Sequence, residues 1–559
     1  MAMGETRSIG QTKGMGLFNG IEFSRKDVGI IVALTLATAT LLMVFFLTYS
    51  IYFAIGAGVA GSAMFYKFMK PILQRDSDRT NINSNIPFFI TSFATLSVSA
   101  ANRIDIVDIL SRKDKLGRLA KDMEKLHNLV KNWRRGLSEA AMFLSKKTPS
   151  EVFEDFLSRF GHAIDSGQDF EEFVKNESET VMSNFETSYI SALYSFDLFK
   201  DLYVSMLLAF AFLITFVMIM PVLISINILD VLTLSLVAII LGEAMLTYGI
   251  KIVLPNDPIW HDTGIKTPLQ LELRRAMILA LIACGAIAAA VIALKLYERI
   301  PFYFAITMVI TPLAYPGYLG SNAEKKVAKK DDMFGSFIRA LSGSASARGN
   351  MVIDALKSIV LHDFGTLTRD VRDLYRRLVY RIDSIRSWKY FSADTGSHLI
   401  EVFSESFVES IDLGADAAEA GKVVADNFDR VVRMRKRRHA SVSSYVGVLY
   451  GITGGLAFSL AISFGVLEII NKVFASFDVS TLSDFGIFVS QPPSAIIEIE
   501  AFLVVILLVH SFIAGTALKV ADGGKVTHGL HHFVIMSWIV TATLYGTLYL
   551  TSIMLSGAL

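Results

Sequence analysis

Nine long apolar runs constrain this chain more than any other feature of its sequence. They lie at about residues 30–48, 51–69, 202–225, 229–250, 276–295, 302–320, 444–467, 500–518 and 533–554. A helix needs about 20 mostly apolar residues to cross a bilayer, and each run comes close to that length. Because lipid offers the backbone no hydrogen-bond partner, a spanning segment of this kind has to be a helix. The sequence therefore predicts an all-α, polytopic membrane protein with about nine transmembrane helices.

The overall composition agrees with this class and excludes others. Of the 559 residues 53% are hydrophobic, and the formal net charge is only +1, so no nucleic-acid partner is indicated. Cys284 is the single cysteine, which excludes an internal disulfide and a cysteine-based zinc site. The second apolar run follows the first at once without a small-residue cleavage site. This pattern indicates a retained membrane anchor and not a secretory signal.

The basic residues predict which side of the membrane each segment occupies, because lysine and arginine concentrate in cytoplasmic loops. With the N-terminus inside, only Lys295, Arg299 and Lys472 of the 53 basic residues fall outside. We therefore expect a multi-pass protein of the plasma membrane. Its N-terminus and both long polar stretches would be cytoplasmic, and its C-terminus outside.

The two polar stretches are expected to fold as helical bundles, because apolar residues recur in them at helical spacing. One such stripe holds Val152, Phe153, Phe156, Leu157 and Phe160, and another holds Leu399, Ile400, Phe403, Phe407 and Ile411. The predicted order is a cytoplasmic tail (1–29), a transmembrane pair (30–69), cytoplasmic domain 1 (70–201), four transmembrane helices (202–320), cytoplasmic domain 2 (321–440) and three transmembrane helices (441–559).

A short pattern occurs once in each polar stretch. Residues 164–169 read "IDSGQD" and residues 411–416 read "IDLGAD", and each is followed three residues later by a glutamate. Glycine permits the left-handed backbone that ends a helix, and an aspartate can cap the next one. We interpret both as a helix stop and restart, made by Asp165, Gly167, Asp169 and Glu172 and by Asp412, Gly414, Asp416 and Glu419. The alternative is a cation site at Asp165 and Asp169, and at Asp412 and Asp416.

A second repeated segment supports an internal duplication. "LSVSAANRIDIVDIL" at 96–110 is similar to "LSGSASARGNMVIDAL" at 341–356, at nearly the same offset as the first pair. Both segments place small residues before the apolar start of a helix. The two domains are therefore predicted to be homologous copies of one bundle.

Enzyme signatures are missing from the sequence. It has no phosphate-binding loop, no serine nucleophile elbow and no H-E-x-x-H pattern, so we expect a protein that is not an enzyme and has no cofactor. "HGLHH" could place His528, His531 and His532 around a metal, although histidines beside a span also serve as interfacial polar groups.

Two ionisable residues, Glu243 and His510, fall within predicted spans. Such residues are functional candidates, and the alternative is that they pair with each other or lie near span ends. Gly447, Gly451 and Gly455 form a small-residue stripe that would let helices pack closely, within one chain or between two.

Two basic clusters flank predicted spans. One consists of Arg433, Arg435, Lys436, Arg437 and Arg438, and the other of Lys325, Lys326, Lys329 and Lys330. They could anchor the chain against anionic lipid headgroups, or dock an acidic cytoplasmic partner.

The repeated segments, the paired I-D-x-G-x-D-x-x-E turns and the order of spans and domains resemble the type II secretion system F / type IV pilus platform family. The chain has more spans than bacterial members and lacks their Gly-Glu-x-x-Gly turn, as in the archaeal branch. The resemblance implies a platform without catalytic activity, often dimeric, for an archaellum or an adhesive pilus. A hexameric secretion-type ATPase would dock on it, by way of the basic clusters above, and drive assembly of archaellin or pilin-like subunits, and rotation in an archaellum motor. A transporter with two regulatory domains is the rival interpretation, and a membrane enzyme is a third.

Overall fold

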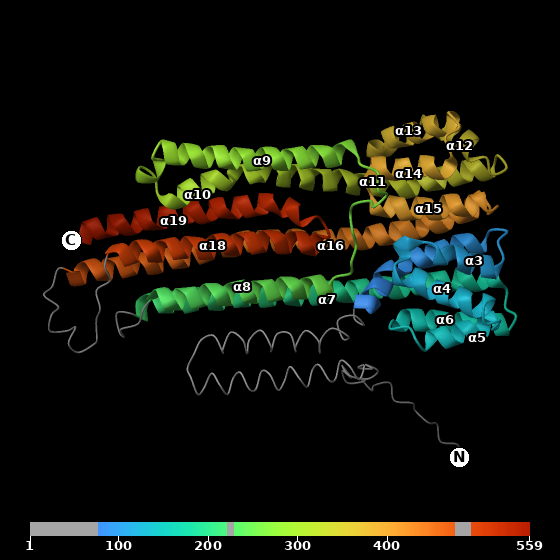
Figure 1. Cartoon of the computed structure of the whole chain (residues 1–559), viewed down its shortest axis with the longest axis horizontal. Helices are drawn as coiled ribbons and strands as arrows, with labels where there is room; N and C mark the ends of the chain where they lie inside the picture. The colour runs from blue at the N-terminus through green and yellow to red at the C-terminus, as the bar shows by residue number, and fades with distance from the viewer. Residues whose placement is uncertain (1–76, 221–227, 476–492, 559) are drawn as a thin grey trace, which may run out of the picture.

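The structure is a computed structural model that describes residues 77–220, 228–475 and 493–558. Within these residues the chain is helical and contains no β-strand, only an isolated bridge between Trp260 and Ser397. Long apolar helices form one end of the molecule and two polar bundles form the other, as Figure 1 shows. The predicted all-α fold is confirmed.

Seven helical segments of the described residues are long and apolar enough to cross a membrane. They match the seven predicted runs from 202–225 onward, so the polytopic architecture is confirmed. The N-terminal tail and the runs at 30–48 and 51–69 lie outside the described residues. The spanning segments belong to α7 (Phe170–Ile219), α8 (Ile228–Val253), α9 (Pro268–Ala293), α10 (Phe302–Ile310) with α11 (Ala314–Ser346), α16 (Ala417–Ala475), α18 (Pro493–Asp522) and α19 (Leu530–Ala558).

Three of these helices also belong to the polar bundles. α7 has 50 residues and α16 has 59, far more than a bilayer requires, and α11 has 33. No helix break occurs at the predicted domain boundaries 201/202, 320/321 and 440/441. The span predicted at 302–320 is instead interrupted, because the 3-10 turn η4 (Thr311–Leu313), which contains Pro312, separates α10 from α11.

Bundle 1 packs short helices against the start of α7. It consists of a helix over residues 77–97, α3 (Arg103–Ser111), the 3-10 turn η1 (Asp114–Leu116), α4 (Arg118–Lys131), α5 (Leu137–Ser145), α6 (Glu151–Asp165) and the polar part of α7. The predicted α6 stripe lies in its core, where Phe153, Phe156 and Phe160 stack along one helix face. Phe89 and Phe93 of the first helix meet these rings edge-on.

Bundle 2 repeats the same order of elements. It consists of the polar part of α11, α12 (Val352–Ile359), the 3-10 turn η5 (Gly365–Leu367), α13 (Thr368–Val379), α14 (Ser384–Thr395), α15 (His398–Asp412) and the start of α16. The last three helices each begin 247 residues after their counterparts in bundle 1: Ser384 after Leu137, His398 after Glu151, and Ala417 after Phe170. The same helices in the same order are what an internal duplication produces.

The two bundles share one continuous hydrophobic core. Phe88 of bundle 1 meets Phe403 of α15 at a centroid distance of 5.7 Å, and both rings belong to the same buried cluster. Buried polar contacts cross the same interface, where Ser92 and Ser406 lie 2.6 Å apart and Asn427 donates to Thr91. Because this contact is buried and polar groups match across it, the bundles form one body.

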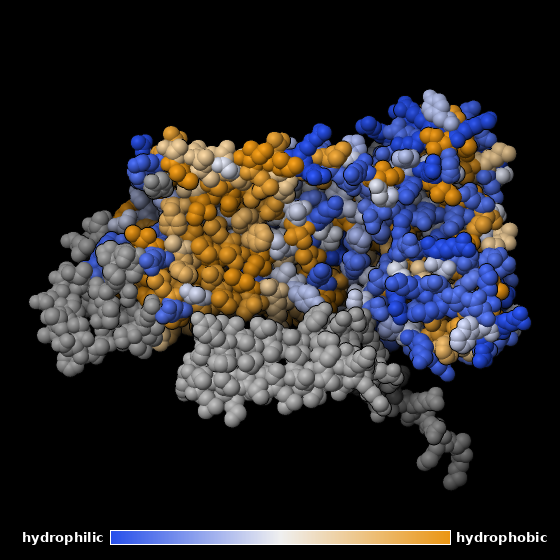
Figure 2. Space-filling view, in the orientation of Figure 1, coloured by the Kyte–Doolittle hydropathy of each residue, from blue (hydrophilic) through white to orange (hydrophobic). Residues whose placement is uncertain are grey.

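Both bundles lie at the same end of the apolar helices, together with the α8–α9 loop (254–267) and the α18–α19 connection (Figure 1). Figure 2 shows hydrophobic side chains over the long helices on the left and hydrophilic side chains over the bundles on the right. The α9–α10 connection, which holds Lys295 and Arg299, lies at the opposite end. The bundles and the α9–α10 connection thus lie at opposite ends of the apolar helices (Figure 1), and which end is cytoplasmic stays a prediction.

Candidate functional site

The α8–α9 loop is one of the segments that connect the bundles to the apolar helices. Two prolines, Pro255 and Pro258, keep it from continuing as a helix. Its backbone pairs with the start of α15, where the His261 amide donates to the Gly396 carbonyl and the His398 amide to the Ile259 carbonyl, each at 3.0 Å. In Figure 1 it crosses the molecule where bundles and spans meet, and we call this region the junction.

A buried arginine of α16 holds this loop to bundle 2. Arg435 makes a bidentate pair with Asp257 of the loop and a 3.1 Å ion pair with Asp331 of α11. Its side chain is 13% exposed, and those of the two aspartates 8% and 2%. Burial alone would raise the pKa of Asp257, but the charges of Arg435, Arg438 and His398 outweigh it and hold the pKa below its usual value.

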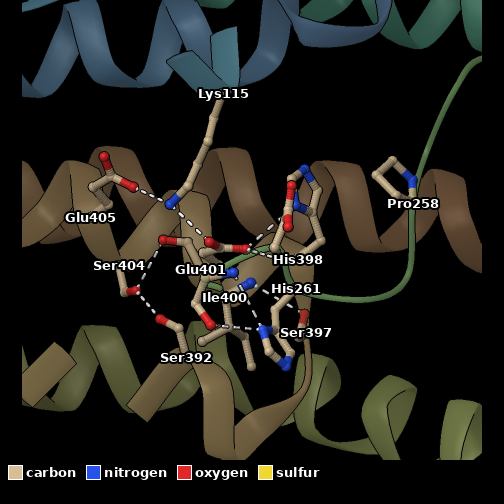
Figure 3. Close-up of polar contacts among 12 residues, drawn as sticks. Lys115, Pro258, His261, Ser392, Ser397, His398, Ile400, Glu401, Ser404 and Glu405 are labelled. Atoms are coloured by element: carbon tan, nitrogen blue, oxygen red, sulfur yellow. Dashed lines mark hydrogen bonds and ion pairs between the residues drawn. The ribbon is translucent and has the colours of Figure 1, made fainter. Parts of the chain in front are cut away.

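Bundle 1 reaches the same region through a lysine. Lys115 of η1 contacts Glu401 of α15 at 2.9 Å and Glu405 at 2.5 Å, as Figure 3 shows. Glu401 also accepts the Asp262 amide of the loop at 2.8 Å. Burial opposes ionisation of Glu401, but His398, Lys115 and the Asp262 amide together lower its pKa to about 2. The carboxylate is therefore charged at neutral pH and bridges bundle 1, bundle 2 and the loop.

Ser397 connects Asp331 to the first turn of α15, which carries Glu401. Ser397 caps α15 by accepting the Ile400 amide, and its hydroxyl donates to Asp331. One polar network thus runs from Lys115 through α15 to Arg435 and the loop. Separating these elements would leave buried charges without a partner, which is strongly unfavourable. We therefore expect the two bundles and the loop to move together.

Arg438 is also buried, and its guanidinium group donates hydrogen bonds to backbone carbonyls. It donates to the carbonyls of Ala521 and Val520 at the end of α18 and to the carbonyl of Pro255 in the loop. A cation is favourable at the C-terminal end of a helix. Arg435 and Arg438 are therefore structural, which corrects the prediction that they lie on a docking face.

The other basic candidates remain near the junction. Lys436 pairs with Asp332 at 2.8 Å and Lys330 with Asp370 at 2.7 Å. The remaining five are exposed: Arg433, Arg437, Lys325, Lys326 and Lys329. Lys329 lines a cavity of about 420 Å³ between α11, α16 and the facing ends of α18 and α19. Lys325, Lys436 and four carboxylates also line it: Glu324, Asp331, Asp332 and Asp522.

A pattern of apolar residues in α16 could have predicted from the sequence which arginines are buried and which are exposed. Phe428, Val431, Arg435, Arg438, Val442, Tyr445 and Leu449 recur at spacings of three and four, and all except Arg435 are buried while Arg435 is nearly so. For Lys115, Asp257, Asp331 and Glu401 no comparable signal exists, and sequence reasoning missed them.

The two ionisable residues predicted within spans contact each other. Glu243 of α8 and His510 of α18 lie 2.6 Å apart, and both side chains are fully buried. The second His510 nitrogen contacts the Thr453 hydroxyl of α16 at 3.1 Å. The pair joins three apolar helices, which is the structural alternative that the sequence left open.

The three histidines near residue 530 point to separate partners. His528 contacts Glu324 at 2.5 Å, His531 donates to the His528 carbonyl, and His532 contacts the Tyr450 hydroxyl at 2.6 Å. Among the described residues no group of three or more His, Cys, Asp or Glu side chains is arranged to hold a metal ion.

The paired turns have nearly identical geometry in the two bundles. Gly167 and Gly414 adopt left-handed φ values of +70° and +85°. Asp169 accepts the Glu172 amide at 2.8 Å, and Asp416 accepts the Glu419 amide at 3.1 Å. Each aspartate thus caps the helix that follows, and Asp165 and Asp412 end the helices before.

The glycine stripe of α16 does not pack against the described helices. Gly447, Gly451 and Gly455 are exposed, and a Cβ at any of them would meet no described atom within 4 Å. The close packing of this stripe, within one chain or between two, therefore stays a prediction.

Known proteins resemble the chain over most of its length. It is 35% identical to "Flagella accessory protein J" of Methanocaldococcus jannaschii over 86% of the chain and 87% of the relative. It is 34% identical to the protein of the same name from Methanococcus voltae over 84% and 85%. The family described as "Type II secretion system (T2SS), protein F" matches residues 89–219. The chain belongs to the flagella accessory protein J branch of this family.

The match to the secretion system F family covers the larger part of bundle 1 and all of α7. In this family member bundle 2 repeats the elements of bundle 1, as described above. No solved structure matches the chain.

Proposed function

We propose that this chain is the membrane platform of an archaellum, with both bundles in the cytoplasm and the C-terminus outside. A hexameric secretion-type ATPase docks on the bundles, and the platform passes its motion to archaellin subunits that leave the membrane. The chain itself performs no catalysis. The names of its relatives support a flagellar filament over an adhesive pilus.

One observation carries this proposal. α7 and α16 run without a break from the bundles through the apolar end, and α11 extends from bundle 2 into that end as far as the η4 turn. A continuous helix is stiff over this length, so a displacement of its bundle end also displaces its membrane end. The buried junction makes the two bundles and the α8–α9 loop follow the same displacement. A transporter, the rival function, would need a polar path across the membrane. The two ionisable residues singled out within the spans, Glu243 and His510, instead contact each other in the interior of the described helices.

The exposed basic residues are assigned to the membrane surface in this proposal. Lys436 and Arg437 lie where α16 approaches the apolar helices, at the level of the Arg438 contacts with the end of α18. Basic residues at this level bind anionic headgroups. The open glycine stripe of the same helix would face a second copy of the chain.

Weakening the α16 helix where it enters the apolar helices tests whether α16 transmits force. Lys436→Gly with Arg437→Gly removes two exposed side chains and weakens the helix by about 1 kcal/mol per glycine relative to alanine. We expect this variant to bind the ATPase in detergent but to assemble fewer filaments in cells, counted by electron microscopy. The matched Lys436→Ala, Arg437→Ala variant loses the same charges and keeps the helix, so it should assemble more filaments than the glycine variant.

Equal filament numbers in the glycine and alanine variants would contradict transmission through α16. Solute flux through proteoliposomes that contain only the wild-type chain would instead support the transporter.

A further inference from the structure

Two loops at the tips of the bundles carry the same exposed pair of residues. The α4–α5 loop holds Trp133 and Arg134, and the α13–α14 loop holds Tyr380 and Arg381, each 247 residues after its counterpart. Trp133 is 74% exposed and Tyr380 80%. Neither ring contacts another aromatic ring within the residues that the structure describes. Tyrosine, tryptophan and arginine are enriched in protein interfaces relative to the rest of the surface.

Both arginines occupy a backbone position that favours glycine. Arg134 has a φ of +52° and Arg381 a φ of +56°. Each follows the end of a helix. The Ile382 amide donates to the Arg377 carbonyl, the bond of the common left-handed helix ending, and the Arg135 amide donates one residue further back, to the Leu129 carbonyl. A non-glycine residue is disfavoured in this conformation, because its Cβ comes too close to the following carbonyl oxygen.

The chain uses glycine at other helix ends of the same bundles. Gly167, Gly396 and Gly414 all adopt left-handed φ values where α6, α14 and α15 end. At the two tip loops it instead keeps an aromatic–arginine pair in both copies. A side chain that is retained twice at a cost to the backbone points to a function outside the fold.

The two loops lie at the end of the bundles that is remote from the apolar helices. α4 begins beside Asn81, near the start of the first helix, and extends about 20 Å along it. α13 begins beside Lys330 of α11 and extends in the corresponding direction. The tips are therefore open to a partner that approaches from the cytoplasm.

Their charge indicates what kind of surface they fit. Residues 128–139 contain three basic side chains and one acidic, and residues 376–389 contain five basic and one acidic. An aromatic ring flanked by arginine is the composition of an interface hot spot. Its complement is an apolar pocket with carboxylates on its rim.

We propose that Trp133–Arg134 and Tyr380–Arg381 are two equivalent docking elements for one symmetric, homo-oligomeric cytoplasmic protein, which presents such an acid-rimmed pocket on each subunit. Two similar loops on one chain match two identical pockets on one ring, and the second contact becomes intramolecular once the first has formed. This inference rests on the proposed function, in which that oligomer is the ATPase.

The test measures binding of the purified hexameric ATPase to the full-length chain in nanodiscs by biolayer interferometry. Trp133→Ala and Tyr380→Ala should each weaken binding about 30-fold, the effect of losing one hot spot. The double variant should lose binding almost completely, because no second site remains to hold the complex.

A second variant separates docking from folding. Arg134→Gly with Arg381→Gly relieves the left-handed strain, so the chain should be at least as stable as the wild type in a thermal unfolding scan. The same variant should bind the ATPase at least tenfold more weakly, and its affinity should depend less on salt. The matched control is Phe143→Ala, which removes a 55% exposed ring from α5 of bundle 1 and should leave binding unchanged.

The outcomes discriminate between the two proposals. Unchanged ATPase affinity in the double alanine variant would overturn the docking role of the loops while leaving the platform function in place. A wild-type chain that does not bind the ATPase would overturn both. Equal loss of affinity in the Phe143→Ala control would show that any exposed ring has this effect, and would also overturn the assignment.

Discussion

The N-terminal ends of α6 and α15 occupy equivalent places in the two bundles but carry different chemistry. Ser150 caps α6 and donates to Asn83, while Ser397 caps α15 and donates to Asp331. Glu154 in the first turn of α6 is exposed, whereas the equivalent Glu401 is 2% exposed and ion-paired. Neutral contacts thus suffice in bundle 1, and buried charges replace them in bundle 2.

The difference shows how the duplicated bundles are used. The start of α15 contacts the α8–α9 loop and bundle 1, so its polar groups have partners that α6 lacks. The tips of the two bundles, by contrast, keep the same turns and the same aromatic–arginine loops. Bundle 2 anchors the assembly to the spans, and both bundles present similar tips.

Removing Arg435 should produce the largest difference in stability between equivalent positions of the two bundles. Arg435→Met leaves Asp257 and Asp331 buried without a cation and should lower the free energy of unfolding by about 3–5 kcal/mol. The equivalent position in α7 is Ser188, which is exposed, and Ser188→Ala should change stability by less than about 0.5 kcal/mol. Denaturant unfolding in micelles, followed by tryptophan fluorescence, measures both. A similar loss in the two variants would mean that the bundles are anchored alike.

Glu401 should make the stability of bundle 2 depend on pH. Glu401→Gln should lower stability by about 2–3 kcal/mol at pH 6, because a buried charged hydrogen-bond partner is lost. Since the folded pKa of about 2 lies below that of the unfolded chain, the stabilisation is complete above about pH 4.5 and is lost as the pH falls toward 2.

The measurement is the stability difference between the wild type and Glu401→Gln across this pH range. That difference should shrink with acidification. Glu154→Gln in bundle 1 is the matched control and should give a small difference that does not vary with pH. A pH-independent effect of Glu401→Gln would contradict the ion pair with Lys115.

The sequence predicted the helices and their repetition because both follow from local periodicity. It could not distinguish Glu401 from Glu154, since both lie in the first turn of a helix after a capping serine. Their difference arises from Lys115, which is distant in sequence and meets only one of them. The charge of Arg435 and Arg438 suggested that both are exposed. They are instead buried because they lie on the same face of α16 as Phe428 and Val442.

Removing the two capping serines should lower stability by amounts that differ less than those at the Arg435 and Glu401 positions. Ser150→Ala removes a helix cap and should cost about 1 kcal/mol. Ser397→Ala also deprives buried Asp331 of a donor, so it should cost about 1.5–2 kcal/mol. Thermal unfolding of the two single variants measures the difference, and threonine at each position should restore the cap. Equal costs would mean that the Ser397–Asp331 contact adds nothing beyond capping.

The tip turns should show no difference between the bundles. Gly167→Ala and Gly414→Ala each force a side chain into the left-handed region, at a cost of about 1 kcal/mol. A Cβ on Gly167 would meet open space, and one on Gly414 would meet the Ala100 side chain at 3.8 Å, an ordinary contact. The two variants should therefore unfold within a few tenths of a kcal/mol of each other. A much larger loss at Gly414 would show that the tips have also diverged, because the contact with bundle 1 would then constrain the second turn and not the first.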